Sequence, residues 1–370
     1  MRLIHLADYR GPYAGSLVPM LRAACAVGTR EGWEVELLLS DVARGRPWLQ
    51  AFADDGIPVH FVPAGSRGEA QAAIAAHMAG VSGPAILHSH FASFDIPLVR
   101  ALRGRPRTGL WWHLHSHLER EPLIRLRNTA RFLVYGRGVD EILCVSPHLL
   151  REARTRLAPA GRVHLLPNAI DTRQFPLVTP DERASAREEL GLPADARVVV
   201  HLGWDWLRKG GDLLLDAVER LADLDDLVVL SVGSGEVGAR AIAAHRLEGR
   251  VRQLDPFDDT SRLYAATDVL VHPSRDEGMP LSVIEALSRG IGVVASSIPG
   301  HRYVGRDLGA IRYSDLEPGG IAAGVRELLA RDPAIVDRDA RNAHERVAAS
   351  LDLRQWAEAL RDRYRRRAPL

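Results

Sequence analysis

Residues 268–287 read DVLVHPSRDEGMPLSVIEAL and contain the pattern that decides the fold. The apolar run Asp268–His272 predicts a buried strand, and the polar segment Pro273–Gly278 predicts a loop. A helix is expected to begin near Leu281. A strand that leads through a polar loop into a helix is the repeating unit of parallel α/β sheets.

The same alternation runs along most of the 370-residue chain. In the first half we expect strands at 2–7, 34–39, 57–62, 85–89, 109–115, 140–145 and 162–166, with helical patterns such as Ser16–Arg30 and Glu69–Met78 between them. In the second half we expect strands at 197–202, 227–232, 250–254, 268–272 and 291–296. The pattern predicts an α/β fold with two Rossmann-like domains, whose parallel sheets face a central cleft.

Length and two prolines predict the domain boundaries. A chain of 370 residues exceeds what one hydrophobic core normally serves. Residues 176–180 read PLVTP and interrupt the alternation. We therefore expect domains over 1–175 and 176–352. A C-terminal helix over 353–370 follows, which can cross back to the first domain.

Composition excludes several protein classes. The charged fraction of 26% and the hydrophobic fraction of 46% exclude collagen, coiled coils and wholesale disorder. Cys25 and Cys144 are too few to crosslink the chain, so we expect buried thiols in a reducing compartment. The chain begins with a strand pattern rather than a signal peptide and contains no apolar run of 18 residues. These features predict a cytoplasmic protein.

The charge distribution is uneven. Residues 1–170 contain 20 arginines and 14 acids (+6), whereas residues 171–370 contain 28 basic residues and 33 acids (−5). This asymmetry favours a cleft that holds an anion, but it is too weak for a nucleic-acid binder. Of the 48 cationic residues 47 are arginine, and the single lysine is Lys209. Coding bias explains the arginines but not the position of that lysine.

Two carboxylates flank the helix start in the opening stretch. Glu277 lies in the loop at the carboxyl end of a strand, where α/β sheets bind ligands, and Glu285 lies about one turn into the helix. The free amides of Met279–Ser282 suit an anion such as a diphosphate. The two carboxylates can accept hydrogen bonds from sugar hydroxyls. Alternatively, they only stabilise the helix start electrostatically.

A second candidate motif, GWDWLRKGGDLL at residues 203–214, also follows a strand and precedes a helix. Arg208 and Lys209 could hold a diphosphate there, the arginine as a fork and the lysine as a point charge. The alternative is a solvated pair. A cation at a helix N-terminus is unfavourable without an anion, which favours a functional role.

Residues 233–238 read GSGEVG and fit the dinucleotide-binding pattern, with Asp255 about 20 residues further on. This pattern supports an alternative, an NAD(P)-dependent oxidoreductase. Against that alternative, the preceding strand is the second of its domain rather than the first. Glycine turns of this kind are also common before helices.

Two of these motifs resemble those of the retaining GT-B glycosyltransferases of family 4 (glycosyl transferases group 1). One is the Glu-x7-Glu pattern from Glu277 to Glu285, and the other is LPNAIDTRQF at residues 166–175, which is similar to the family's PNGVDxxxF. Residues 32–35, 203–210 and 233–235 also look similar to family motifs. The resemblance implies an acceptor-binding first domain and a nucleotide-sugar-binding second domain.

The resemblance also implies roles for single residues. Glu277 would bind hydroxyls of the donor sugar, and Glu285 the ribose of the nucleotide. Arg208 and Lys209 would stabilise the departing diphosphate. Further donor contacts are implied for Gly278, Met279, Pro280, Leu281, Gly15, Ser16 and Gly233.

A histidine is implied across the cleft, near the sugar and the acceptor. His113 and His115 alternate onto the same side of a strand, so both are candidates. We favour His115 because it stands at the strand tip.

Three positions depart from the family pattern. Trp204 stands where an arginine is frequent, and we infer that Arg208 replaces that arginine. Tyr303 stands where a glutamate is common, and Ala169 where glycine is usual.

The implied activity is metal-independent transfer of a sugar from a nucleotide diphosphate sugar to an acceptor hydroxyl, with retention of configuration and without a cofactor. The acceptor would be a sugar, a natural product or a lipid, and no nucleic-acid partner is expected. Besides the oxidoreductase, two alternatives stay open: a non-catalytic nucleotide-sugar-binding protein, and a phosphorylase-like enzyme carrying pyridoxal phosphate on Lys209.

Residues 123–135 are basic and amphipathic. Such a stretch suits peripheral contact with the inner face of a membrane, which a lipid acceptor would require. The alternative is a helix that packs its apolar side on the sheet.

Overall fold

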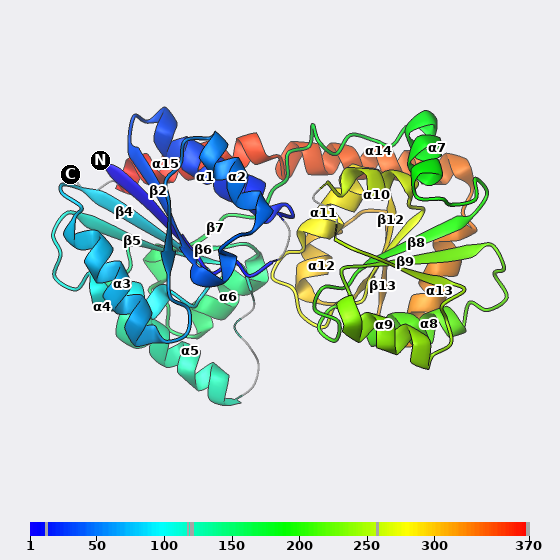
Figure 1. Cartoon of the computed structure of the whole chain (residues 1–370), viewed down its shortest axis with the longest axis horizontal. Coiled ribbons are helices and arrows are strands. Elements are labelled where there is room, and N and C mark those ends of the chain that lie inside the picture. Colours follow the sequence, from blue (N-terminus) through cyan, green and yellow to red (C-terminus); the bar gives the residue numbers. More distant parts are fainter. Residues whose placement is uncertain (12–13, 117, 119–121, 257–258, 368–370) are drawn as a thin grey trace. The chain divides into compact units, whose positions relative to one another are not determined.

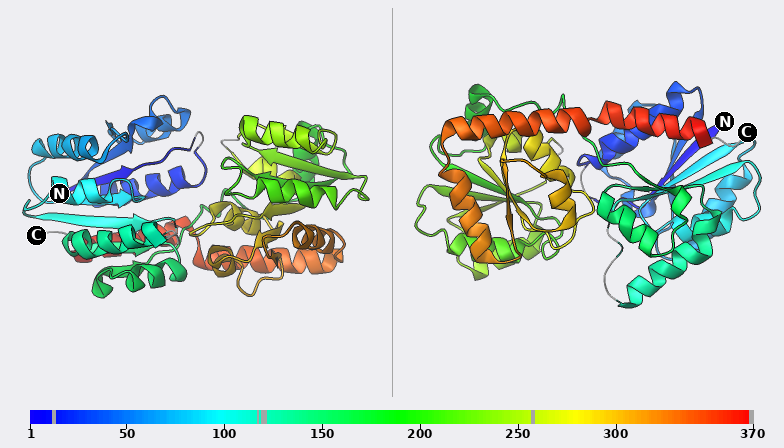
Figure 2. Two further views of the ribbon diagram at one scale, coloured as in Figure 1. Left: turned by 90° about the horizontal axis from the view of Figure 1, so that it is seen from below. Right: turned by 180° about the vertical axis from the view of Figure 1, so that it is seen from behind.

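The computed structural model describes the chain except for residues 12–13, 117, 119–121, 257–258 and 368–370. It divides into two compact units. The first unit comprises Met1–Asn168 with Leu353–Leu370, and the second comprises Ala169–Asp352. Each unit consists of a parallel sheet with helices on both faces (Figures 1 and 2).

The first unit contains seven parallel strands in the order β3-β2-β1-β4-β5-β6-β7. Its strands are β1 (Arg2–Ala7), β2 (Glu34–Ser40), β3 (Val59–Val62), β4 (Ala85–His90), β5 (Thr108–Leu114), β6 (Glu141–Cys144) and β7 (Val163–Leu165). Its helices are α1 (Leu17–Arg30), α2 (Gln50–Asp54), α3 (Arg67–Ala79), α4 (Asp95–Ala101), α5 (Pro122–Tyr135), α6 (Pro147–Thr155) and α15 (Leu353–Arg367).

The second unit contains six parallel strands in the order β10-β9-β8-β11-β12-β13. They are β8 (Arg197–Leu202), β9 (Leu227–Val232), β10 (Val251–Leu254), β11 (Val269–His272), β12 (Gly292–Ser296) and β13 (Ile311–Ser314). Its helices are α7 (Pro180–Glu189), α8 (Gly211–Glu219), α9 (Gly235–Ala244), α10 (Ser261–Ala266), α11 (Leu281–Ser288), α12 (Pro299–Val304), α13 (Pro318–Leu329) and α14 (Pro333–Ser350).

The predicted α/β fold with two parallel-sheet units is confirmed. The central strands are apolar on both faces because helices cover both, as Val199 and Val200 of β8 illustrate. One strand, β13, is absent from the sequence prediction. It is a four-residue strand at the edge of its sheet, and its alternating polar residues gave no apolar run.

The boundary between the two units lies earlier in the chain than the sequence predicts. Residues after Asn168 already belong to the second unit. Ile170 pairs with Asp352, and the hydroxyl of Ser288 donates to the carbonyl of Phe175 at 2.7 Å. These contacts attach Ile170 and Phe175 to the residue pair after α14 and to the end of α11, before the two prolines are reached.

The C-terminal helix α15 belongs to the first unit, as predicted. It packs against α1, where Arg361 and Arg365 donate to the carboxylate of Glu31. Trp356 and Tyr364 are buried on its inner side.

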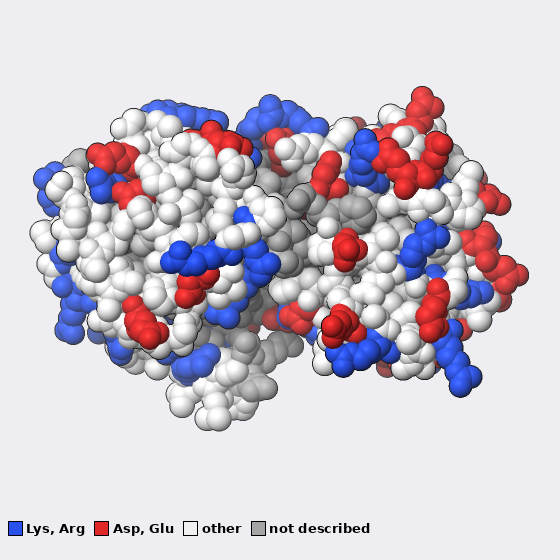
Figure 3. Space-filling view, in the orientation of Figure 1, with Lys and Arg blue, Asp and Glu red and all other residues white. Residues whose placement is uncertain are grey.

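The remaining composition predictions concern thiols, charge and hydropathy. Cys25 and Cys144 are both buried and unpaired, as expected. Figure 3 shows basic groups prominent on the visible face of the first unit and acidic groups on that of the second. Among the described residues, no helix combines the length and the apolar composition needed to cross a bilayer.

Candidate functional site

The second unit brings together three of the predicted site residues. Lys209 precedes α8, and Glu277 lies in the loop between β11 and α11. Lys209 Nζ donates to Glu277 Oε1 at 2.6 Å, and Arg208 Nη1 donates to the same oxygen at 3.2 Å. The Lys209 and Glu277 side chains are only 10% and 12% exposed. One buried carboxylate therefore orients two cations.

Close backbone contacts set this geometry. Gly210 has φ +73°, and a Cβ there would clash with the carbonyl of Pro273, so glycine is required. This contact joins the segment before α8 to the loop after β11. On the other side of that loop, a Cβ at Gly300 would clash with the backbone of Glu277.

Arg208 is held by three further groups. Its Nε donates to Asp205 Oδ2 at 2.7 Å, and its Nη1 donates to the carbonyl of Asp276 at 3.2 Å. Its guanidinium lies 5.1 Å from the ring centroid of Trp204, a cation–π distance. The tryptophan that replaces the family's usual arginine thus contacts the arginine that we inferred to substitute for it. A Cβ added at Gly233 would touch Trp204 as well.

The electrostatics keep this cluster charged. Burial by itself raises the pKa of Glu277, but Lys209 and Arg208 outweigh that effect and hold the pKa below its ordinary value. Burial likewise opposes the charge of Arg208, but Glu277 and Asp205 raise the pKa of its guanidinium. The site therefore presents fixed cations that are partly shielded from water, an arrangement suited to a phosphate ligand.

Glu285 forms a second buried carboxylate site on α11. It is 4% exposed and accepts a hydrogen bond from Tyr264 Oη at 2.9 Å and one from Thr260 Oγ1 at 3.3 Å. The helix begins at Leu281, so Glu285 lies one turn inside it, as predicted. The other predicted donor contacts on this loop, Gly278, Met279 and Pro280, are buried against the helix start.

The sequence analysis did not predict a pair of buried histidines near Glu277. His272 Nδ1 and His301 Nε2 are 2.8 Å apart, and His301 Nδ1 lies 2.8 Å from the carbonyl oxygen of Ser296. Burial lowers the pKa of His301 to about 4, against the opposing charge of Glu277. His272 ends β11 and His301 is the third residue of α12, and neither position by itself predicts that the two rings meet.

Three predicted residues belong to the first unit. Gly15 has φ +50°, and Ser16 directly precedes α1. His115 follows the last residue of β5 and is partly exposed, whereas His113 is 1% exposed. This difference favours His115 for ligand contact. Its role toward a donor bound to the second unit stays a prediction, as do the roles of Gly15 and Ser16.

The glycine pattern at residues 233–238 has a packing explanation. It follows β9, which lies beside β8 rather than opening the unit. A Cβ at Gly238 would clash with Ser234 and press on Trp206. Close packing at the start of α9 thus accounts for this glycine without a dinucleotide.

Two family models match the chain. The model described as "Glycosyltransferase Family 4" matches residues 25–174, and the model described as "Glycosyl transferases group 1" matches residues 196–331. The two parallel-sheet units define the GT-B fold class. The chain belongs to the family 4, group 1 glycosyltransferases, as its motifs predicted. This membership favours the glycosyltransferase interpretation over an oxidoreductase.

Curated relatives match over part of the chain. A D-inositol 3-phosphate glycosyltransferase of Xylanimonas cellulosilytica is 32% identical over an alignment of 225 residues, and the match covers 51% of this chain and 54% of that protein. A phosphatidyl-myo-inositol mannosyltransferase of Mycobacterium tuberculosis is 31% identical over 177 residues, 45% of each chain. The matched region spans about half the length of these relatives.

Solved structures share the fold over nearly the whole chain. Alr3699/HepE of Anabaena, in complex with UDP-glucose, has a TM-score of 0.84 at 18% identity, covering 99% of this chain and 100% of that one. Sucrose-phosphate synthase of Thermosynechococcus elongatus has a TM-score of 0.82 at 22% identity, covering 99% of each chain.

Proposed function

We propose that this protein transfers a sugar from a nucleotide diphosphate sugar to an acceptor hydroxyl, with retention of configuration and without a metal ion or cofactor in the reaction. The observation that carries the proposal is the partly buried cluster of Lys209, Arg208 and Glu277 in the segments that follow β8 and β11. Membership of family 4 supports the same reaction class.

The chemical difficulty of this reaction is charge. The diphosphate gains negative charge as it departs, while the sugar becomes cationic. Lys209 and Arg208, together with the amides at the start of α11, would meet that negative charge in a site that needs no reorganisation. One such contact is typically worth about 3–4 kcal/mol in the transition state. In front-face attack, the departing phosphate would accept the proton of the acceptor hydroxyl.

Glu277 has two tasks in this mechanism. Its pairing with Lys209 holds the ammonium in place before the donor binds. Once the diphosphate engages the cations, the carboxylate would accept hydrogen bonds from hydroxyls of the donor sugar. Glu285, fixed by Tyr264, would bind the ribose.

The names of similar proteins narrow the substrates to be tested. One structural neighbour binds UDP-glucose, and relatives act on inositol phosphate or phosphatidylinositol acceptors. We propose that the donor is a uridine or guanosine diphosphate sugar and that the acceptor is a polyol, a sugar or a lipid headgroup.

Thermal unfolding with a panel of nucleoside diphosphates, followed by mass analysis of products from nucleotide sugars, tests the proposal. A nucleoside diphosphate should raise the melting temperature of the wild type, and a sugar should be transferred or hydrolysed from the donor. NADH fluorescence titration serves as the opposing arm. Binding of NADH without binding of any nucleoside diphosphate would establish the oxidoreductase alternative and overturn the proposal.

We further propose that α5 contacts an anionic membrane surface from the cytoplasmic side. Four large apolar side chains of α5 face solvent at 47–81% exposure: Leu123, Leu126, Leu133 and Val134. Exposed Arg125 and Arg127 lie on the same helix, at the lower end of the first unit in Figure 1. Phe132 of the same helix is buried, with its ring centroid 6.1 Å from that of Trp112 on β5, whereas the four residues above do not pack on the sheet. The two unpaired buried thiols favour a reducing compartment.

Co-sedimentation with phosphatidylglycerol vesicles tests this contact. The variant Leu123→Gln/Leu126→Gln should bind less than the wild type, while Val237→Gln, which changes an exposed apolar residue of the second unit, should bind normally. Equal sedimentation of all three proteins would exclude the contact between α5 and the membrane. Sedimentation that does not depend on the fraction of anionic lipid would exclude it as well.

A further inference from the structure

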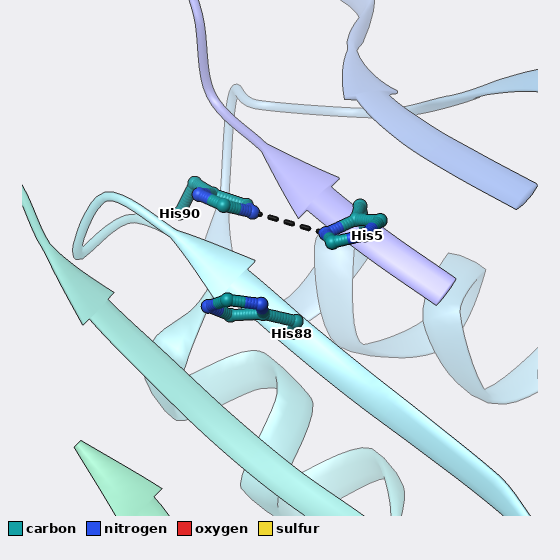
Figure 4. Close-up of side chains that lie close together, drawn as sticks. All are labelled: His5, His88 and His90. Atoms are coloured by element: carbon teal, nitrogen blue, oxygen red, sulfur yellow. Dashed lines mark hydrogen bonds between the residues drawn. The ribbon is translucent and has the colours of Figure 1, made fainter. Parts of the chain in front are cut away.

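The first unit buries a cluster of histidines on one face of its sheet. His5 comes from β1, and His88 and His90 come from the neighbouring strand β4 (Figure 4). His5 and His88 are register partners in the parallel pair. His90 lies two residues beyond His88 and therefore points to the same face. The parallel pairing of β1 with β4 therefore places the three imidazoles next to one another.

The ring nitrogens are within reach of one ion. His5 Nδ1 and His90 Nε2 are 3.1 Å apart, and one nitrogen from each of the three rings lies within 4.8 Å of the others. Nitrogens that share a tetrahedral metal at about 2.0–2.1 Å are separated by a little over 3 Å. Small rotations of the rings would close the remaining gap.

Two of the rings are anchored on their outer side. His88 Nδ1 lies 2.5 Å from the hydroxyl of Tyr364 on α15, and His90 Nδ1 lies 3.2 Å from His115 Nε2. His88 Nε2 has no hydrogen-bond partner in the part of the chain that the structure describes. A ligand histidine typically has this arrangement, with one nitrogen held by an outer partner and the other left for the metal.

Burial lowers the pKa of all three histidines, that of His5 to about 4.

We propose that His5 Nδ1, His88 Nε2 and His90 Nε2 bind one divalent late transition-metal ion of the Zn²⁺ type. Three imidazoles without thiolates suit Zn²⁺, Co²⁺, Ni²⁺ or Cu²⁺ and do not suit Mg²⁺ or Ca²⁺. The site lies in the first unit and takes no part in the proposed departure of the diphosphate.

A bound metal would also fix a tautomer. With Nε2 on the metal, His90 must carry its proton on Nδ1 and donate it to Nε2 of His115. His115 would then carry its own proton on Nδ1. The metal would thus set the orientation and tautomer of the partly exposed histidine.

A second histidine group needs to be distinguished from this one. His90, His113 and His115 also place one nitrogen each within the same distance of one another. His113→Gln therefore serves as the matched control for His5→Gln, because both remove a buried imidazole from the same face and only His5 belongs to the proposed site.

Titration of the metal-free protein with Co²⁺, followed by its visible ligand-field absorption, tests the proposal. The wild type and His113→Gln should bind one Co²⁺ per chain in a tetrahedral, nitrogen-rich site, and Zn²⁺ should displace it. His5→Gln should lose at least about tenfold in Co²⁺ affinity, the size expected for loss of a ligand or its support. Loss in His113→Gln with retention in His5→Gln would overturn the assignment, as would absence of a tetrahedral spectrum in the wild type.

X-ray absorption of zinc-loaded His113→Gln keeps the test decisive if His5→Gln fails to fold, because this variant lacks the second histidine group. Three imidazole ligands at about 2.0 Å would support the site. Two or fewer imidazoles per zinc would refute it, because the group of Glu36, His60 and His77 on the same unit supplies a carboxylate and two histidines.

Discussion

Two clusters of ionisable groups, one in each unit, differ in how burial affects them. In the second unit, Lys209 and Arg208 donate to the same oxygen of Glu277, and the two cations hold the pKa of this carboxylate below its ordinary value. In the first unit, the clustered histidines have no carboxylate to pair with in the described contacts, and burial lowers their pKa values instead. Each group has a member at the carboxyl end of a parallel strand, since Glu277 lies in the loop after β11 and His90 is the last residue of β4. The comparison teaches that pairing, not position in the fold, decides whether a buried group keeps its charge.

The largest effect is expected from removing the charge of the second unit. Lys209→Ala should lower kcat at least about 10²-fold with the fold intact, because a preorganised cation at the leaving group is lost. Steady-state turnover of the donor measures this, with Arg240→Ala, an exposed arginine on α9, as control. Near-normal turnover of Lys209→Ala would remove the assigned role.

Lys209→Arg sharpens the same point. The charge is kept, but the planar guanidinium is larger than the compact ammonium and cannot occupy the same 2.6 Å contact with Glu277. We expect kcat to fall, though less than in Lys209→Ala. Full activity of Lys209→Arg would mean that the positive charge at this position, and not the shape of the side chain, determines kcat.

The neutral cluster predicts a loss of stability in acid. The folded-state pKa of His5 is about 4 and its ordinary value is 6.5, so the unfolded chain binds more protons between these values. The free energy of unfolding that depends on neutral His5 is fully present above pH 6.5 and is lost as the pH falls toward 4. For His5 alone it is on the order of 3 kcal/mol. Urea unfolding at several pH values, with a chelator present, should show a shallower loss for His5→Gln than for the wild type. An unchanged slope would contradict the buried neutral state.

A smaller effect is expected at Glu285. Tyr264→Phe removes the hydroxyl that donates to the Glu285 carboxylate at 2.9 Å, and the same hydroxyl also lies 3.1 Å from the carbonyl of Ser282. We expect a loss of about 1–2 kcal/mol in the free energy of unfolding. Affinity for a nucleoside should fall more than affinity for inorganic diphosphate. Equal losses for both ligands would argue against a ribose contact.

The smallest effect is expected at Trp204. Its ring contacts the Arg208 guanidinium but is about half exposed. Trp204→Ala should therefore weaken diphosphate binding by about 0.5–1 kcal/mol, and Trp204→Phe should restore part of it. Isothermal titration measures both. A loss as large as that of Lys209→Ala would assign the ring a direct ligand contact.

The sequence predicted the charged site better than the neutral one for a physical reason. Charged residues at strand ends, such as Lys209 and Glu277, are unusual enough to stand out, and family motifs contain them. The histidines of β1 and β4 stand out individually, but their proximity depends on strand order, which places β1 beside β4. The pairing of His272 with His301 likewise depends on how α12 meets β11, and no local pattern records it.

The preference of the protein for diphosphates over monophosphates tests the central claim most directly. Titration calorimetry with UDP and UMP, or GDP and GMP, should show tighter binding of the diphosphate by the wild type. In Lys209→Ala this preference should shrink by about tenfold or more while monophosphate affinity changes little, since the lost contact is to the outer phosphate. An unchanged diphosphate preference in Lys209→Ala would contradict the account.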